Sequence, residues 1–284
     1  MKKNTCLSVA GLVLGCALMP YANAQFGTEP AKLDLIKLQD DLYVIHNEIV
    51  PGNVTALITD DGVLLVDDKY EIDHDNLMAM LKTVTDQPVK YVINTHVHDD
   101  HSGGNAKLQG ADALVVASDQ ARVRMVAADR SGLPDVTVRD SATLYIGGKR
   151  VEIYWFGRSH TDGDVVVLFP EHRALAAGDM YTVGEGLPQL INYADGGSAK
   201  EWTATVERAL MLDFDTVIPG HGLPVTKADM QEFRDSTVRL RELVSEMVKQ
   251  NKAKAEIDAA MRAEFGWQDF HVQISLDGLI NEMR

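Results

Sequence analysis

The segment Thr95–Asn105, which reads Thr-His-Val-His-Asp-Asp-His-Ser-Gly-Gly-Asn, constrains the fold of this chain more than any other stretch. It follows the apolar run 89–93, which we expect to be a buried strand. His96 and His98 lie two residues apart, so in an extended segment their side chains point to the same side. The fold must therefore present ligand-type side chains at the point where a buried strand ends.

The second half of this segment changes direction. Asp100 and His101 are adjacent, so they face a second point, and the glycines at 103–104 allow a tight bend into a helix. A single histidine here would most simply lie on the surface or cap a helix. Because three histidines and two aspartates occur within residues 96–101, we interpret this cluster as part of a metal site.

Three further potential ligands stand where other apolar runs give way to turns that contain glycine. They are His160 in Gly-Arg-Ser-His-Thr, Asp179 after Ala-Gly, and His221 in Pro-Gly-His-Gly. Each turn alone is weak evidence, because strands commonly end in such residues. Together with the first cluster they complete a set of imidazole and carboxylate ligands, which suits zinc.

The rest of the chain alternates short strands and helices. Two β-rich runs flank the turn at 60–62, which reads Asp-Asp-Gly and indicates a hairpin. Ser198, with Glu201 three residues later, has the pattern of a capping box at a helix start. Further helices are expected at 73–85, 118–128 and 227–250. This order predicts a layered α/β fold, and the hairpins argue against a purely parallel sheet.

These motifs and their order resemble those of the metallo-β-lactamase superfamily. The resemblance runs from Asp67, in Val66-Asp67, through residues 96–101 to His221. It implies an α/β fold of four layers, an αββα sandwich with a metal site along one edge and a helical C-terminal tail. It also implies one domain over residues 25–284, with its core at about 33–224 and its C-terminal helices at 225–284.

The resemblance further implies a zinc-dependent hydrolase with two Zn²⁺ per chain. One ion would be held by His96, His98 and His160 and the other by Asp100, His101 and His221, with Asp179 bridging them and Asp67 orienting the histidine loop. The two ions would activate a shared water that attacks the carbonyl of a cyclic amide or ester-like substrate. Asp100 and His101 are therefore also catalytic candidates.

The residue type at position 179 distinguishes between the possible substrate classes. In the branches that hydrolyse antibiotics this position is typically Cys or a non-ligand residue, whereas a bridging aspartate resembles glyoxalase II and the lactonases. A lactonase or thioesterase is therefore the alternative enzyme, and a non-catalytic zinc-binding or sensor protein is the alternative of another class. Tyr181 and Tyr193 are candidates for donating to an oxyanion, although packing under a loop is the simpler interpretation. The turn 49–53 is expected at the opposite rim.

The first 24 residues have the pattern of an export signal. Two lysines precede an apolar stretch, and Ala22-Asn23-Ala24 fits cleavage after Ala24. A lipoprotein signal that ends at Cys16 is the weaker alternative. We therefore expect a periplasmic or secreted protein with no stable membrane anchor after cleavage. Both cysteines, Cys6 and Cys16, precede the cleavage site, so the mature chain has no disulfide.

The formal net charge of the chain is -15. A protein this acidic repels phosphate backbones, which argues against nucleic acid as a partner. The expected partner is a small-molecule substrate. The sequence leaves the oligomeric state open.

Overall fold

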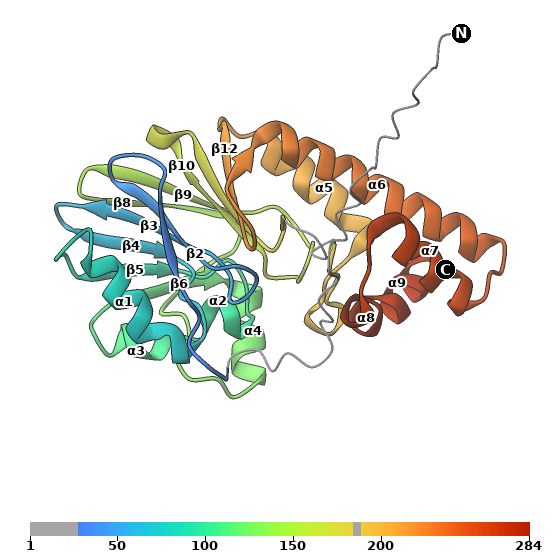
Figure 1. Cartoon of the computed structure of the whole chain (residues 1–284), viewed down its shortest axis with the longest axis horizontal. Coiled ribbons are helices and arrows are strands. Elements are labelled where there is room, and N and C mark those ends of the chain that lie inside the picture. Colours follow the sequence, from blue (N-terminus) through green and yellow to red (C-terminus); the bar gives the residue numbers. More distant parts are fainter. Residues whose placement is uncertain (1–27, 184–188) are drawn as a thin grey trace, which may run out of the picture.

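The computed structural model of the chain describes residues 28–183 and 189–284. Two β-sheets face each other, and helices cover the outer side of each sheet (Figure 1). The four-layer α/β architecture predicted from the sequence is therefore confirmed. The predicted export signal at residues 1–24 lies outside the described residues.

The first sheet has seven strands in chain order. They are β1 (Asp34–Lys37), β2 (Leu42–His46), β3 (Val54–Thr59), β4 (Gly62–Val66), β5 (Val89–Ile93), β6 (Leu114–Ser118) and β7 (Val136–Val138). Strands β1 to β4 pair antiparallel, which confirms the hairpin around residues 60–62. Strands β4 to β7 pair parallel, so their carboxyl ends meet at one edge.

The second sheet has six strands, in the order β13-β12-β11-β10-β9-β8. They are β8 (Ser141–Ile146), β9 (Lys149–Trp155), β10 (Val165–Phe169), β11 (Ala174–Gly178), β12 (Thr216–Pro219) and β13 (Val225–Thr226). Only β11 and β12 pair parallel. Both sheets are therefore mixed, as the hairpins in the sequence predicted.

Strand β4 shows why the apolar runs in this sequence are nearly continuous. Leu64 and Val66 belong to the core between the two sheets, whereas Val63 and Leu65 belong to the core between the first sheet and its helices. Because both faces of the strand are covered, the alternation of polar and apolar residues that marks a half-exposed strand is absent.

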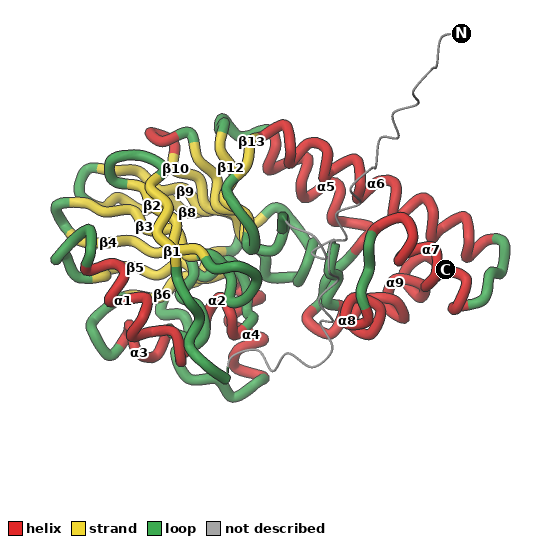
Figure 2. Tube along the Cα trace, in the orientation of Figure 1, coloured by secondary structure: helices red, strands yellow, loops and turns green. Residues whose placement is uncertain are grey.

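The helices are α1 (His74–Lys82), α2 (Asp99–Ser102), α3 (Asn105–Gln109), α4 (Asp119–Ala127), α5 (Ala199–Leu210), α6 (Lys227–Lys249), α7 (Lys254–Phe265), α8 (Asp269–His271) and α9 (Asp277–Met283). The helices expected at 73–85, 118–128 and 227–250 are thus present, with ends shifted by up to three residues. Helices α5 to α9 form the helical C-terminal part, which extends to one side of the sheets (Figure 2). Among the described residues, no helix is long and apolar enough to cross a membrane.

The capping box expected at the start of α5 is only half formed. Ser198 Oγ accepts a hydrogen bond from Glu201 N at 3.1 Å, as predicted. The backbone N–H of Ser198 donates instead to Ser159 O at 3.0 Å, and the Glu201 carboxylate pairs with Arg158. The carboxylate that binds the Ser198 hydroxyl comes from Glu282 in α9. Groups distant in sequence, Ser159 O and the Glu282 carboxylate, therefore take the hydrogen bonds of Ser198 that do not go to Glu201.

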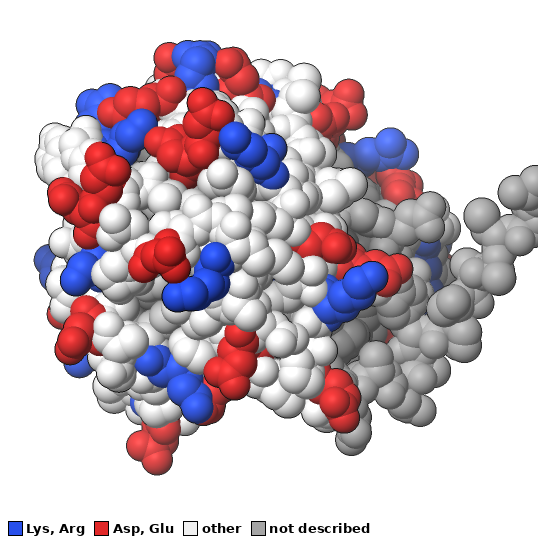
Figure 3. Space-filling view, turned by 60° about the vertical axis from the view of Figure 1, so that its left-hand side comes forward, with Lys and Arg blue, Asp and Glu red and all other residues white. Residues whose placement is uncertain are grey.

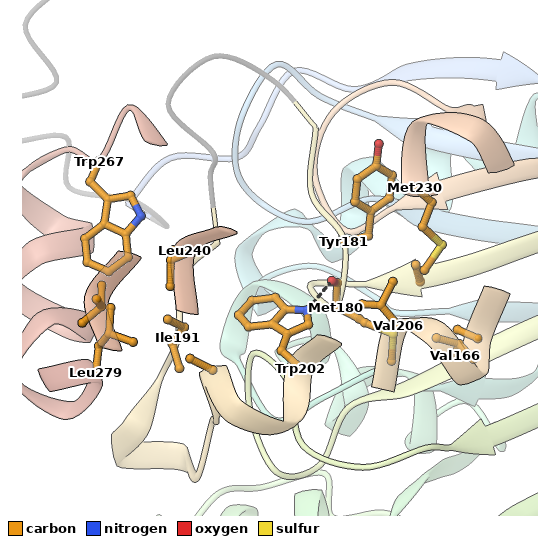
Figure 4. Close-up of a cluster of buried hydrophobic side chains, with 14 of the residues drawn as sticks. Val166, Met180, Tyr181, Ile191, Trp202, Val206, Met230, Leu240, Trp267 and Leu279 are labelled. Carbon is orange, nitrogen blue, oxygen red and sulfur yellow. Dashed lines mark hydrogen bonds between the residues drawn. The ribbon is translucent and has the colours of Figure 1, made fainter. Parts of the chain in front are cut away.

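A third hydrophobic core, besides the one between the sheets and the one under the helices of the first sheet, lies between the second sheet and the C-terminal helices. Trp202 and Trp267 are among its largest fully buried side chains, and the Trp202 indole donates to Met180 O at 2.9 Å (Figure 4). Ile191, from the segment before α5, packs in the same cluster. The surface outside these layers carries acidic and basic side chains side by side on the face shown in Figure 3, without a continuous basic patch.

We expect His271 to make the stability of the protein dependent on pH. Its side chain is fully buried beside Trp267 and Phe270, and burial lowers the pKa of its imidazole to about 4. The unfolded chain, with a pKa of about 6.5, binds the proton more readily. We therefore expect stability to be complete above pH 6.5 and to fall by about 3 kcal/mol as the pH falls to 4.

Urea unfolding of the wild type and of His271→Gln, measured at several values of pH, checks this expectation. The difference in unfolding free energy between the two proteins should shrink as the pH falls through this window. Parallel curves for the two proteins would contradict it.

Candidate metal centre

The parallel strands explain why residues far apart in the sequence meet. Val66 at the end of β4 is paired with Ile93 at the end of β5, so Asp67 and the histidine segment emerge side by side. In the second sheet, β11 and β12 run parallel and end together at Gly178 and Pro219. Asp179 follows Gly178 directly, and His221 follows Pro219 after one glycine. The carboxyl ends of both parallel pairs therefore deliver ligand-type side chains to one edge of the sandwich.

His96, His98 and His160 form the first cluster. His98 Nδ1 lies 3.0 Å from His96 Nε2 and 2.9 Å from His160 Nε2. The opposite nitrogen of His160 faces Leu190 O at 2.6 Å and must donate its proton there, which leaves the inward nitrogen with a lone pair. Three imidazole nitrogens that converge in this way fit a divalent cation.

Asp100, His101 and His221 form the second cluster. The Nε2 atoms of the two histidines are 3.3 Å apart, and Asp100 Oδ2 lies 3.5 Å from that of His101 and 3.4 Å from that of His221. The outer nitrogens are again occupied, since His101 Nδ1 faces Asp67 Oδ2 at 2.8 Å and His221 Nδ1 faces Ile49 O at 2.7 Å. These contacts fix the direction of both rings.

The carboxylate of Asp179 lies between the two clusters. Its Oδ1 is 3.2 Å from His101 Nε2 and 3.4 Å from His221 Nε2, while its Oδ2 is 3.6 Å from His160 Nε2. Oδ1 is buried without a hydrogen-bond partner among the residues that the structure describes, as expected for an atom that serves a cation. A side chain at position 220 would place its Cβ 2.0 Å from this oxygen, which explains Gly220.

The two clusters differ in their electrostatics. Burial, reinforced by the neighbouring histidines, lowers the pKa of His96 well below its ordinary value and favours the neutral imidazole. Burial also opposes the charged form of His101, but the carboxylates of Asp100, Asp179 and Asp67 outweigh it and raise the pKa of His101 well above its usual range. A cation at the second cluster would replace the proton that these carboxylates attract.

Asp67, which the resemblance implied as the residue that orients the histidine loop, contacts the histidine segment from behind. Its carboxylate accepts hydrogen bonds from Thr95 N at 2.7 Å and Thr95 Oγ1 at 2.8 Å, in addition to its contact with His101. Asp67 and Lys69 both have a φ of 65°, a left-handed conformation that is uncommon outside glycine. Backbone strain of this kind is found where the surrounding structure fixes a functional geometry.

Lys69 is a residue of the site that the sequence analysis missed. Its side chain is fully buried, and its Nζ donates to Asn47 Oδ1 at 2.6 Å and to Gly52 O at 2.7 Å. Burial lowers its pKa to about 7. A lysine that follows two aspartates at the end of an apolar strand was the available signal, but nothing local indicated that the loop 47–53 would fold over it.

The loop 47–53 covers the second cluster. Gly52 N donates to Asp100 O at 3.1 Å, and Asn53 N donates to Gly220 O at 2.7 Å. The expected position of the turn 49–53 at the rim agrees with these contacts. Gly52 lies directly against the His101 ring, because a Cβ there would be 2.2 Å from His101 Cε1.

The Gly52→Ala variant should therefore push the His101 imidazole out of the second cluster. We expect metal affinity at this cluster to fall about 10- to 100-fold, as is usual when a ligand loses its support. Zinc titration of the metal-free protein measures it. Gly110→Ala is the matched control, since its nearest contacts are 3.3 Å or more away. Equal affinities of the two variants would contradict this expectation.

The two tyrosines considered from the sequence have their side chains elsewhere. Tyr181 is buried in the core next to the second sheet (Figure 4). Its ring contacts that of Phe233. The Tyr193 hydroxyl donates to Glu282 at 2.7 Å. The structure does not bring either residue among the converging ligand atoms, and packing and helix capping account for their positions.

Asn192 and Asp195, which the sequence analysis did not single out, do reach the first cluster. Asn192 Nδ2 lies 2.8 Å and Asp195 Oδ2 lies 3.1 Å from His98 Nε2. The hydrogen bond and charge of His98, together with Arg124, outweigh burial and set the pKa of Asp195 below its ordinary value, so its carboxylate is ionised at neutral pH. A carboxylate at this position fixes the ring and raises the basicity of its inward nitrogen.

Two facing mixed sheets, covered by helices and carrying five histidines and two aspartates at one edge, define a metallo-hydrolase architecture. Residues 48–221 match the family profile of the metallo-beta-lactamase superfamily. The chain therefore belongs to the metallo-beta-lactamase superfamily, and it is a metallo-hydrolase.

Relatives and solved structures agree with this assignment. The chain is 26% identical over 246 residues to the metallo-beta-lactamase type 2 of Bacillus sp. (strain 170), which covers 78% of this chain and 94% of the relative. It is 24% identical to metallo-beta-lactamase IND-1 of Chryseobacterium indologenes, over 75% of this chain and 91% of the relative. The structure of a metallo-beta-lactamase from Pontibacter korlensis superposes with a TM-score of 0.66 at 25% identity, over 72% of this chain and 99% of that one. DIM-1 metallo-beta-lactamase shares the fold, with a TM-score of 0.64 at 20% identity.

Proposed function

We propose that this protein is an exported hydrolase that uses two zinc ions to cleave the carbonyl bond of a cyclic amide or ester-like small molecule. The observation that carries the proposal is the position of Asp179, whose two oxygens reach toward different histidine clusters. A carboxylate placed in this way suits a pair of cations held close together. Neutral imidazoles and carboxylates, in the absence of thiolates, suit zinc.

We propose that His96, His98 and His160 hold one ion, that Asp100, His101 and His221 hold the other, and that Asp179 bridges them. Zinc supplies a Lewis acid and a water activated for attack near neutral pH. Asp100 is more exposed than the histidines beside it, with 16% of its side chain accessible against 0% and 5%. It is therefore placed to accept a proton from a water that enters the site, while Asp67 keeps the His101 ring in position.

Two kinds of evidence favour different substrates. The relatives are named as metallo-beta-lactamases, which supports a β-lactam, a cyclic amide, as the substrate class. The bridging Asp179 supports a lactone or a thioester instead, as the sequence analysis inferred. The β-lactamase-like reaction remains the leading proposal because the fold and most of the chain match these relatives.

A substrate panel tests the proposal. The purified protein is loaded with zinc and assayed with a chromogenic cephalosporin, an acyl-homoserine lactone and a glutathione thioester. We expect metal-dependent hydrolysis of at least one, with slow turnover of the cephalosporin. Hydrolysis of the lactone or the thioester alone would replace the β-lactam proposal with the alternative enzyme. Tight zinc binding without turnover of any substrate would favour the zinc-binding or sensor protein.

Export and domain organisation belong to the same proposal. We propose that residues 1–24 are removed and that residues 25–284 form one domain, because the core that contains the second sheet continues into the C-terminal helices. N-terminal sequencing of the protein recovered from a periplasmic fraction should begin at Gln25. An uncleaved or lipid-modified N-terminus would contradict this.

A further inference from the structure

The segment 190–195 contacts two of the three histidines in the first cluster. Leu190 O accepts a hydrogen bond from His160 Nδ1 at 2.6 Å, and the side chains of Asn192 and Asp195 lie 2.8 Å and 3.1 Å from His98 Nε2. These groups set the tautomer and the direction of both rings. The geometry of the cluster therefore depends on where this segment is held.

The C-terminal helices hold the same segment from its other side. Ile191 N donates to Ser275 Oγ at 2.9 Å, and both residues are fully buried. The Tyr193 hydroxyl donates to Glu282 at 2.7 Å. The ring of Tyr193 packs so closely on α9 that a Cβ at Gly278 would lie 2.1 Å from it. The segment is thus fixed between the histidine cluster and α9.

Glu282 connects these contacts to the start of α5. Its carboxylate accepts hydrogen bonds from the Ser198 hydroxyl and from Ala199 N at 2.9 Å, as well as from Tyr193. A negative charge is stabilised at the N-terminus of a helix by the unpaired N–H groups there. One side chain near the end of the chain therefore ties α5 to the segment 190–195. The stretch that matches the family profile ends at His221, so Glu282 lies well beyond it.

We infer that Glu282 is a positioning residue for the three-histidine cluster and acts on it through Tyr193 and the segment 190–195. This inference rests on the proposed function, because it takes His98 and His160 as ligands of the first zinc ion. Without the Glu282 carboxylate, the segment keeps its contacts with Ser275 and Gly278 but loses its hydrogen bond to α9, so the partners that aim the inward nitrogens of both histidine rings are held less firmly. The C-terminal helices are then part of the metal centre and not an appendage.

The test compares Glu282→Ala with Glu282→Gln, which retains an acceptor oxygen, in the full chain. Metal-free proteins are titrated with zinc in the presence of a competing chelator, and with Co²⁺ while its visible absorption is recorded. For Glu282→Ala we expect about tenfold weaker binding at the three-histidine cluster and an altered Co²⁺ spectrum, with binding at the second cluster within about twofold of wild type. Glu282→Gln should recover part of the loss. Asn281→Ala, an exposed position on the same helix, is the control.

Two results would overturn the inference. One is wild-type binding and an unchanged Co²⁺ spectrum in Glu282→Ala, and the other is an equal weakening at both clusters, which would indicate general loosening of the fold. If Glu282→Ala does not fold, Tyr193→Phe decides, because it keeps the ring against Gly278 and removes only the hydroxyl bond. It should weaken the first cluster in the same selective way. Failure of the wild type to bind two ions would instead overturn the proposed function.

Discussion

The Asp179→Asn variant is expected to lose about three orders of magnitude in kcat/KM while keeping its fold. The amide has the shape of the carboxylate but no charge, so it cannot offset two cations between His160 on one side and His101 and His221 on the other. Loss of a cation as Lewis acid removes several kcal/mol of transition-state stabilisation. About 1.36 kcal/mol corresponds to a tenfold change in rate, so about 4 kcal/mol gives this loss.

Metal content should fall in parallel, from two ions per chain to one. Asp99→Asn is the matched control, because Asp99 adjoins the second cluster in sequence but is 71% exposed and pairs with Arg130. We expect its kcat/KM to stay close to that of the wild type. If Asp179→Asn retained both ions and full activity, the bridging role of Asp179 would be wrong.

Removal of the metal is expected to abolish hydrolysis and to lower the melting temperature by about 10 °C. A ligand at about 1,000 times its Kd stabilises a protein by about 4 kcal/mol, and each kcal/mol shifts the melting temperature of a domain this large by about 2–4 °C. In the metal-free protein the converging nitrogens of His96, His98 and His160 have no cation between them. Treatment with a chelator, followed by calorimetry and activity assays, measures both effects.

Readdition of zinc should restore both activity and melting temperature. Calcium at the same concentration should not, since it prefers clusters of oxygen ligands and these sites are rich in imidazole. Metal-free protein that hydrolysed its substrate at an unchanged rate would contradict the proposed mechanism. A restored melting temperature without activity toward any substrate would support the zinc-binding alternative.

The C-terminal helices lie outside the segment by which this protein is matched to the family, although they contact residues beside the first cluster. The family profile covers residues 48–221 and therefore all seven proposed ligands, but not the helices α6 to α9. The contacts of Ser275 and Glu282 place part of the support of the first cluster outside that segment. Differences in metal affinity between this chain and its relatives are therefore expected to originate partly in these contacts.

The sequence by itself determined the layered α/β class and the set of candidate ligands, while the four-layer arrangement was implied by the resemblance to the superfamily. The class and the ligand set depend on local features: continuous apolar runs reveal strands buried on two faces, and glycine-containing turns after those runs reveal where polar side chains leave the sheet. The spacing of His96 and His98 already required two rings on one side of the chain. Parallel pairing of neighbouring strands then brings their carboxyl ends to one edge.

Apart from Asp67, the tertiary structure alone decided which groups support these ligands. His98 meets Asp195 across 97 positions of sequence, and Ser198 meets Glu282 across 84. No periodicity or turn pattern encodes such contacts, because they depend on how whole helices pack. The half-formed capping box at Ser198 is an example, since Ser159 O accepts the backbone N–H bond that the local pattern assigned to Glu201, and the carboxylate that binds the Ser198 hydroxyl comes from α9.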